Sequence, residues 1–215
     1  MAEGAERRGR PLVVATRNPG KLRELLPMLD EAGWRGMTLD GAGLPEAPDE
    51  DAIEAFATFE ANALAKARHF ARLTGLPTLA DDSGLAVDAL GGAPGVHSKR
   101  WAQRELDVES VDARENDARN NTLLLERLRG APDRHASFVC AAAFVDGERE
   151  LVRVGACRGR IAEAPSSGVH GFGYDPLFIA DELGMTFAEA TREQKHAVSH
   201  RGRAVRALLV ALGDA

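Results

Sequence analysis

Asp81 and Asp82 are the residues of this chain with the most direct chemical use. They stand between an apolar run that ends at Ala80 and the pair Ser83-Gly84. Carboxylate oxygens are the ligands that hard cations such as Mg²⁺ prefer. Because Asp, Ser and Gly also favour turns, the sequence predicts a tight acidic turn here. Two adjacent carboxylates at the end of a buried strand repel each other, and a bound cation would relieve that repulsion.

A second stretch has the residue types that hold phosphate groups. It joins an apolar strand pattern to a helix pattern, and its members are Thr16, Arg17, Asn18, Pro19, Gly20 and Lys21. Free backbone N–H groups at a helix start attract phosphate oxygens, and the Lys21 ammonium and Asn18 amide would add to them. An ordinary capped turn with a solvated lysine is the alternative. The spacing does not match a Walker loop. Together the two stretches indicate a magnesium-dependent enzyme that acts on a polyphosphate.

Residues 171–176 form a glycine-rich aromatic segment, Gly-Phe-Gly-Tyr-Asp-Pro. Glycine lets a backbone approach a ligand closely, and the ring of Phe172 or Tyr174 could stack on a flat base. A packed aromatic turn is the alternative interpretation.

A basic cluster over residues 195–203 stands out in an otherwise acidic chain. His196 and His200 are four positions apart, a spacing that a zinc site on one helix face would use. We disfavour zinc, because Ser199 is predicted to start a new helix between them and no HExxH glutamate is present. Donors for an anion or a base are the better interpretation, with a solvated basic helix start as the alternative.

The composition limits the function classes. The 215 residues carry a formal net charge of −6, which disfavours a protein that wraps nucleic acid. Two cysteines without clustered spacing, Cys140 and Cys157, indicate a reducing, cytoplasmic setting. The polar residues 1–10 are expected to be a disordered tail, and residues 11–215 a single catalytic domain. No apolar run is long enough to span a bilayer, so we expect no membrane partner.

The periodicity of apolar residues predicts alternating strands and helices. We expect strands over 11–16, 36–39, 78–80, 85–87, 136–145, 150–154 and 177–179, and helices over 21–30, 51–73, 109–128 and 191–212. Asp146-Gly147 is a hairpin signal. The fold class is therefore α/β, with a mixed central sheet flanked by helices and two lobes that enclose an active-site cleft.

Taken together, the motifs resemble the inosine triphosphate pyrophosphatase family over about residues 11–212. The matching segments, in the order of the family, are residues 15–24, 58–67, 80–85, 91–96, 171–176 and 199–202. The resemblance implies an enzyme that hydrolyses noncanonical purine nucleoside triphosphates (ITP, dITP and XTP) to the monophosphate and pyrophosphate. It also implies a homodimer and Mg²⁺ as the cofactor.

The same resemblance implies roles for individual residues. Asp82 would be the proton acceptor and a metal ligand, and Glu54 the second acidic ligand. Residues 16–21 would hold the triphosphate. The rest of the nucleotide site would consist of Ser83, Phe172, Gly173, Tyr174, Asp175, Lys195, His200 and Arg201.

Base selection follows from hydrogen bonding. Hypoxanthine and xanthine carry an oxygen at C6 where adenine has an amine, so a pocket of donors would accept them and leave those donors unpaired against adenine. Arg201, His200 or N–H groups near Phe172 would supply the donors. Two other functions stay open at this point. One is a Maf-like pyrophosphatase of different base specificity, and the other is a nucleotide sensor without catalysis.

Overall fold

The computed structural model describes residues 9–47, 50–108 and 112–213. The described chain divides into two compact units. The first holds the residues up to Asp82, Cys140–Gly155 and those from Arg201 onward; the second holds the residues of Ser83–Val139 and Ala156–His200. The predicted tail lies mostly in residues 1–8, outside the described residues, whereas Arg10 already belongs to the first strand.

The described strands form one seven-stranded mixed sheet with the order β2-β1-β3-β4-β5-β6-β7. The strands are β1 (Arg10–Val14), β2 (Trp34–Thr38), β3 (Thr78–Val87), β4 (His135–Asp146), β5 (Arg149–Ile161), β6 (Phe178–Ala180) and β7 (Met185–Thr186). β1 pairs in parallel with β2 and β3, whereas β6 is antiparallel to β5 and β7. The helices are α2 (Pro19–Glu31), α3 (Phe59–Thr74), α4 (Trp101–Leu106), α5 (Ala113–Arg127), α6 (Arg192–Val198) and α7 (His200–Gly213). The predicted α/β class is confirmed.

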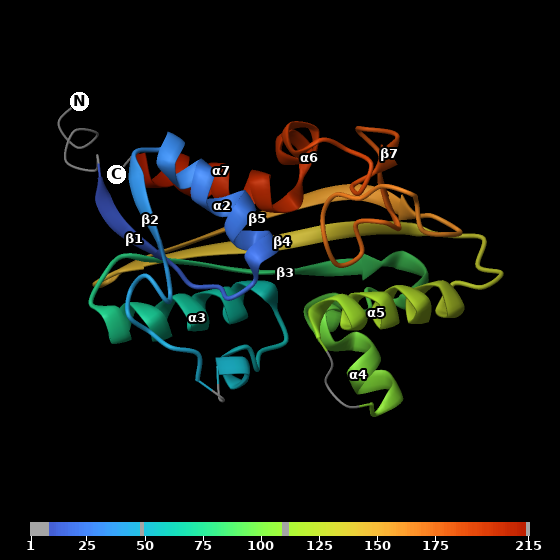
Figure 1. Ribbon diagram of the computed structural model, residues 1–215, viewed down its shortest axis with the longest axis horizontal. Coiled ribbons are helices and arrows are strands. Elements are labelled where there is room, and N and C mark those ends of the chain that lie inside the picture. The colour runs from blue at the N-terminus through green and yellow to red at the C-terminus, as the bar shows by residue number, and fades with distance from the viewer. Residues whose placement is uncertain (1–8, 48–49, 109–111, 214–215) are drawn as a thin grey trace. The chain divides into compact units, whose positions relative to one another are not determined.

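In the first unit the sheet is covered on both faces. Leu12 and Val14 of β1 pack in one cluster with α2 and α7, whereas Val13 and Ala15 pack in another with α3. Figure 1 shows α2 and α7 on one side of these strands and α3 on the other. Alternate side chains of a strand point to opposite faces, so each strand of this unit serves two cores.

The second unit is built around an aromatic core. Phe138 of β4 lies 4.6 Å from the ring of Phe178 and 5.9 Å from that of Phe187, measured between ring centroids. Leu123 and Leu124 of α5 join the same cluster. Burial of these side chains fixes α5 in its place within this unit.

The predicted acidic turn at residues 81–84 is wrong. β3 runs without interruption from Thr78 to Val87, so Asp81 and Asp82 are inside a strand. Their side chains find partners on opposite faces of the sheet, and these tertiary contacts override the local turn preference.

The predicted helix over 51–73 is also wrong in its first part. A short 3₁₀ helix covers Glu50–Ile53, and α3 begins only at Phe59, after Thr58. The Asn62 side chain accepts a hydrogen bond from the Phe56 N–H and donates one to the Phe56 carbonyl oxygen. Because these backbone groups are bonded to a side chain, they are not available to a helix. Glu54 therefore lies in the connection before α3.

The remaining predicted elements overlap observed ones, but β5 continues to Ile161 beyond the predicted end at residue 154, and α4 and β7 were not predicted. α3 ends at Gly75, whose φ of 65° is left-handed. α5 begins at Ala113 after the capping side chain of Asp112, and the predicted start over 109–111 lies outside the described residues. Ser199 separates α6 from α7.

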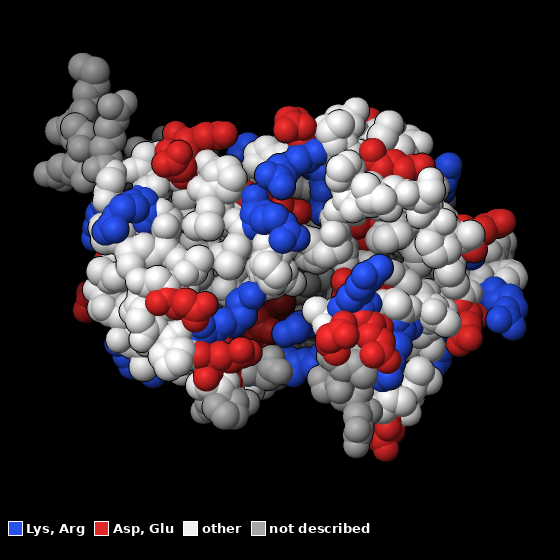
Figure 2. All heavy atoms as spheres, viewed as in Figure 1, with Lys and Arg blue, Asp and Glu red and all other residues white. Residues whose placement is uncertain are grey.

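The surface carries both signs of charge. On the face shown in Figure 2, acidic and basic side chains are interspersed rather than segregated. Among the described residues, no helix has the length and apolarity that crossing a membrane requires.

Candidate active site

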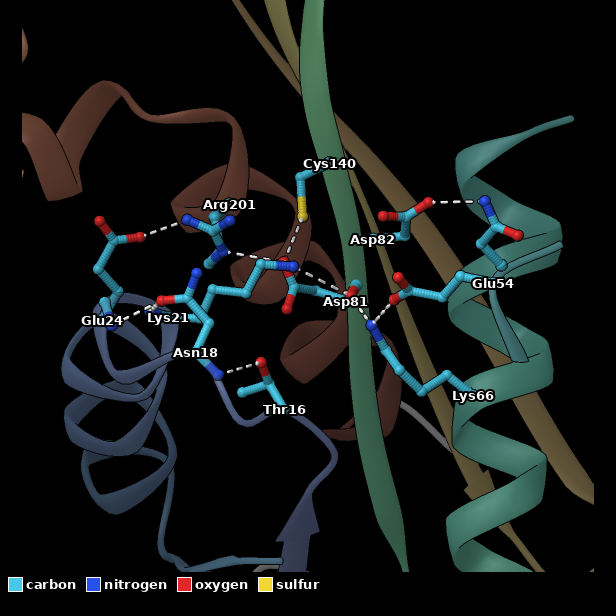
Figure 3. Close-up of polar contacts among 12 residues, drawn as sticks. Thr16, Asn18, Lys21, Glu24, Glu54, Lys66, Asp81, Asp82, Cys140 and Arg201 are labelled. Carbon is cyan, nitrogen blue, oxygen red and sulfur yellow. Dashed lines mark hydrogen bonds and ion pairs between the residues drawn. The ribbon is translucent and has the colours of Figure 1, made fainter. Parts of the chain in front are cut away.

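β3 presents Asp81 and Asp82 to opposite faces of the sheet in the first unit. Figure 3 shows Asp81 on the side of α2 and α7, near Lys21 and Arg201, and Asp82 on the side of α3, near Glu54. The two carboxylates follow one another in the chain, yet they meet different neighbours because consecutive strand residues face opposite ways.

Asp81 is fully buried among cations. Its Oδ2 lies 3.0 Å from Lys21 Nζ and 3.0 Å from Arg201 Nε, and it accepts a hydrogen bond from the Cys140 thiol at 3.8 Å. Burial alone would raise the pKa of this carboxyl, but the charges of Lys21, Arg201 and Lys66 outweigh it and hold the pKa far below its usual range. Asp81 is therefore an anion that organises positive groups around it.

Lys66 of α3 links Asp81 to Glu54. Its Nζ donates a hydrogen bond of 2.7 Å to the Asp81 carbonyl oxygen and forms a close ion pair with Glu54. Burial would lower the pKa of Lys66, but Glu54 and Asp81 raise it, so the side chain stays charged. Burial would likewise raise the pKa of Glu54, and the Lys66 charge lowers it instead. Both groups are thus held in their ionised forms.

Asp82 has a different environment from its neighbour. Its Oδ2 accepts a hydrogen bond of 2.9 Å from the Asn62 amide. Burial, followed by the negative charge of Glu54, raises the pKa of Asp82 in spite of the lysines nearby. A carboxylate with a raised pKa is a better proton acceptor than an ordinary one.

The loop before α2 is built by its own side chains. Asn18 Oδ1 caps the helix by accepting hydrogen bonds from the N–H groups of Gly20 at 2.7 Å and Lys21 at 3.2 Å. The Thr16 hydroxyl accepts a bond from the Asn18 N–H, and Pro19 has no N–H to donate. The first-turn N–H groups expected to meet phosphate oxygens therefore have internal partners. Donors that a phosphate could still meet include the Lys21 ammonium, the Asn18 amide nitrogen and the hydrogen of the Thr16 hydroxyl.

The two arginines that were predicted to contact the nucleotide, Arg17 and Arg201, lie among carboxylates. Arg17 makes a two-pronged ion pair with Glu50, at 2.7 and 3.1 Å, and a further contact with Asp40 at 2.6 Å. Arg201 is 2% exposed, and its Nη1 lies 2.6 Å from Glu24 while its Nε contacts Asp81. These contacts give both guanidinium groups a part in holding the first unit together.

In the second unit, Asp175 organises the predicted aromatic loop. Its Oδ2 accepts hydrogen bonds of 2.7 Å from the Phe172 N–H and 2.7 Å from Lys195 Nζ. The same ammonium lies 5.0 Å from the centroid of the Phe172 ring. A Cβ on Gly171 would lie 2.0 Å from Asp175 Oδ2, so only glycine fits there. Phe172 is half-buried, which leaves part of its ring accessible to a planar ligand.

Three other predicted nucleotide contacts also lie in the second unit. Tyr174 is 4% exposed and donates its hydroxyl hydrogen bond to the Ser98 carbonyl oxygen at 3.0 Å, so Phe172 offers the better stacking surface. His200 is buried with its ring stacked on Phe138 at 4.6 Å between centroids. Ser83 is a half-buried residue of β3.

The chemistry of the donors on the α3 side of β3 fits a hard divalent cation. Glu54 and Asp82 provide carboxylate oxygens, and the Glu54 charge that raises the pKa of Asp82 is a repulsion that a cation would offset. Within residues 9–47, 50–108 and 112–213, no group of three or more His, Cys, Asp or Glu side chains is arranged to hold a metal ion. Mg²⁺ commonly binds through one or two carboxylates plus water and substrate phosphates, so two protein ligands suffice.

A family model described as the Ham1 family matches residues 12–211. The chain belongs to the Ham1 family. The dITP/XTP pyrophosphatase of Mycolicibacterium paratuberculosis is 51% identical over 94% of this chain and 95% of the relative. The dITP/XTP pyrophosphatase of Yersinia pestis is 48% identical over 95% of this chain and 98% of the relative. The resemblance to triphosphate pyrophosphatases is confirmed by these names.

Solved Ham1 structures agree with the fold. A HAM1 protein from Coxiella burnetii superposes with a TM-score of 0.79 at 37% identity, covering 96% of this chain and 100% of the other. A dITP/XTP pyrophosphatase from Mycobacterium abscessus gives a TM-score of 0.69 at 46% identity, covering 93% and 98%.

The structure of this Ham1 chain adds site residues to which the sequence analysis gave no role. Asn62 and Lys66 are four positions apart on α3, a spacing that places two side chains on one helix face. Glu24 stands three positions after Lys21 on α2, a spacing that also places two side chains on one helix face. This polar spacing on otherwise apolar helix faces was a visible signal. Cys140 gave none, because a lone cysteine in an apolar strand looks like core.

Proposed function

We propose that this protein hydrolyses noncanonical purine nucleoside triphosphates, dITP, ITP and XTP, to the monophosphate and pyrophosphate. The observation that carries the proposal is the environment of Asp82: a carboxylate with a raised pKa, held by an amide, next to a second acid and near two ammonium groups. Two relatives that are 51% and 48% identical over nearly the whole chain are named dITP/XTP pyrophosphatase.

In this proposal Asp82 serves the attacking water. Water attacks the α-phosphorus, its proton passes to the Asp82 carboxylate, and the bond to the departing pyrophosphate breaks. Asn62 fixes the direction of the carboxylate by donating to Oδ2. The raised pKa of Asp82 favours it as a base at neutral pH, and a carboxylate bonded directly to Mg²⁺ would be a weaker base.

The positive groups of the first unit act on the phosphates. Lys21 is 14% exposed and is aimed by Asp81, which fixes its ammonium at the sheet. A triphosphate carries about four negative charges, so neutralisation must precede attack by water. Glu54 and Asp82 are the residues that would hold Mg²⁺. The chemistry supplied by a bound Mg²⁺ is neutralisation of charge on the triphosphate and on the departing pyrophosphate.

The second unit supplies the proposed base contacts. Phe172 offers a ring for stacking, and the groups of Asp175, Lys195 and His200 provide polar contacts to the base. Arg201 and Arg17 enter the proposal as residues that position other charges, because their guanidinium groups contact carboxylates. A homodimer and a cytoplasmic location complete the proposal. Cys140 and Cys157 are buried thiols that form no disulfide, which supports a reducing compartment.

The other two candidate functions are less well supported. A Maf-like specificity would need a different family, whereas this chain matches the Ham1 model over 12–211. A sensor that only binds nucleotides gains nothing from a carboxylate such as Asp82 next to phosphates unless a metal ion is bound there.

The test is product analysis over a substrate panel. The pure protein is given XTP, ITP, dITP, ATP and GTP, with and without Mg²⁺, and both pyrophosphate and phosphate are measured. We expect pyrophosphate from the first three at a rate about tenfold or more above that from ATP or GTP, and only with the metal. Asp82→Asn is the matched control and should lose this release. Release of inorganic phosphate with a nucleoside diphosphate as the other product would overturn the proposal.

A further inference from the structure

The glycine at the centre of the aromatic loop is held from both sides by one helix. Gly173 N–H donates a hydrogen bond of 2.7 Å to Asp117 Oδ2, and the Gly173 carbonyl oxygen accepts one of 3.0 Å from Asn121 Nδ2. Asp117 and Asn121 are four positions apart on α5, so they share one face of that helix. All of these residues belong to the second unit.

These two bonds fix both peptide planes next to Gly173. Its N–H belongs to the peptide that joins it to Phe172, and its carbonyl belongs to the peptide that joins it to Tyr174. The Asp175 N–H bonds back to the Phe172 carbonyl oxygen at 3.2 Å, which closes a tight turn, and Gly173 has a φ of 62° within it. A left-handed glycine is the most adaptable point of a turn, so contacts there decide the conformation of the loop.

Holding Gly173 also sets the direction of the Phe172 side chain. The Phe172 N–H is fixed by Asp175, and its other peptide is fixed through the Gly173 N–H by Asp117. With both flanking peptides held, the direction of the Phe172 Cα–Cβ bond is fixed, and the ring lies against the Lys195 ammonium. Burial and the negative charge of Asp175 raise the pKa of Asp117, which is consistent with a carboxylate set closely against the loop.

We propose that Asp117 and Asn121 are positioning residues for base recognition, which hold the Gly171–Asp175 loop so that the Phe172 ring is ready to stack on the purine. This inference rests on the proposed function. It assigns to α5 a role on the base alone, separate from the phosphate chemistry of Asp82 and Lys21. Preorganising a loop in its bound form strengthens binding by removing the cost of ordering it.

The test separates binding of the base from binding of the phosphates. Asp117→Ala and Asn121→Ala are assayed for KM and kcat with XTP, and for inhibition of XTP hydrolysis by inorganic tripolyphosphate, which has no base. We expect KM to rise about tenfold, the effect of losing one well-placed hydrogen bond. The kcat and the inhibition constant of tripolyphosphate should stay within about twofold of the wild type, since phosphate contacts are unchanged.

Two further variants keep the test independent of folding. Asp117→Asn retains an oxygen that can accept from Gly173 N–H, so it should restore most of the affinity lost in Asp117→Ala. Glu115→Ala, at an exposed carboxylate of α5 that pairs with Arg119, should behave as the wild type. Equal losses for XTP and tripolyphosphate, a fall in kcat alone, or an unchanged KM would overturn the inference. A wild-type protein that releases no pyrophosphate from XTP would overturn the proposed function, and the inference with it.

Discussion

Asp81 and Asp82 are the same residue type at adjacent positions, and their surroundings give them opposite properties. Asp81 faces α2 and α7, where Lys21 and Arg201 hold its pKa far below the usual range. Asp82 faces α3, where burial and Glu54 raise its pKa. A pair of acids whose environments drive their pKa values apart commonly divides the work between them.

The comparison shows how one strand can serve structure and chemistry at once. The acid with several cationic partners is fixed in charge and place, so it is suited to organise Lys21 and Arg201. The acid held by the Asn62 amide keeps its affinity for a proton, so it is suited to serve a water molecule. The strand alternation that separates the two faces makes this division possible.

The largest expected effect is on stability, from Asp81→Asn. Removing the charge leaves the buried Arg201 and the partly buried Lys21 without their shared anion. Breaking a buried ion pair by removing one partner costs about 3 kcal/mol or more. Denaturant unfolding of the variant and the wild type measures this loss. If Asp81→Asn unfolds within about 1 kcal/mol of the wild type, Asp81 is not the anchor that its contacts indicate.

The complementary variant is Asp82→Asn, whose main effect should be on turnover. An asparagine can still accept the Asn62 hydrogen bond, so the free energy of unfolding should change by about 1 kcal/mol at most. Turnover of XTP should fall by about a hundredfold, the scale of a lost general base. Steady-state pyrophosphate release checks this. Turnover near the wild-type value would remove Asp82 from the mechanism, and the division into a structural Asp81 and a catalytic Asp82 would be wrong.

The cations beside Asp81 can be compared through their effect on base choice. Lys21→Ala should slow XTP and ATP hydrolysis by similar factors, about tenfold each, because a contact to the shared triphosphate cancels from the ratio. Arg201→Lys should also leave the XTP-to-ATP ratio unchanged, because Arg201 contacts Asp81 and Glu24. The measurement is kcat/KM for both substrates. A ratio that narrows only in Arg201→Lys would show that Arg201 reads the 6-oxygen, as the sequence predicted.

An effect no larger than that of Lys21→Ala is expected from Asn62→Ala, which tests how Asp82 is held. The change removes the amide that fixes the carboxylate, so turnover should fall by about tenfold while Asp82 remains present. Combining it with Asp82→Asn should add little, because both changes act on the same group. Single-turnover rates of the three variants provide the check. If the rate losses of the two single variants multiply in the double variant, Asn62 does not act through Asp82.

The chain order and residue types were enough to predict the α/β class. The role of Asp82 as base and metal ligand came from the family resemblance and stays a prediction. The short apolar run of β1 and the helical spacing of apolar residues in α2 are local signals, which a sequence shows directly. The acidic turn was predicted wrongly because the contacts that keep residues 81–84 in a strand come from far along the chain. Arg201 is 120 positions from Asp81, and Cys140 is 59 positions away.

The helix predicted over 51–73 failed for a related reason. The Asn62 side chain bonds to the Phe56 backbone and also to Asp82. The periodicity of apolar residues does not predict such contacts of a polar side chain. The hold of Asp117 and Asn121 on Gly173 spans 56 and 52 positions and was equally hidden.

Hydrolysis of XTP in ¹⁸O-labelled water tests the central claim most directly, because it reports which phosphorus the water attacks. If a water served by Asp82 attacks the α-phosphorus, mass spectrometry will find one ¹⁸O in the xanthosine monophosphate and none in the pyrophosphate. Label in pyrophosphate or in free phosphate would contradict the account.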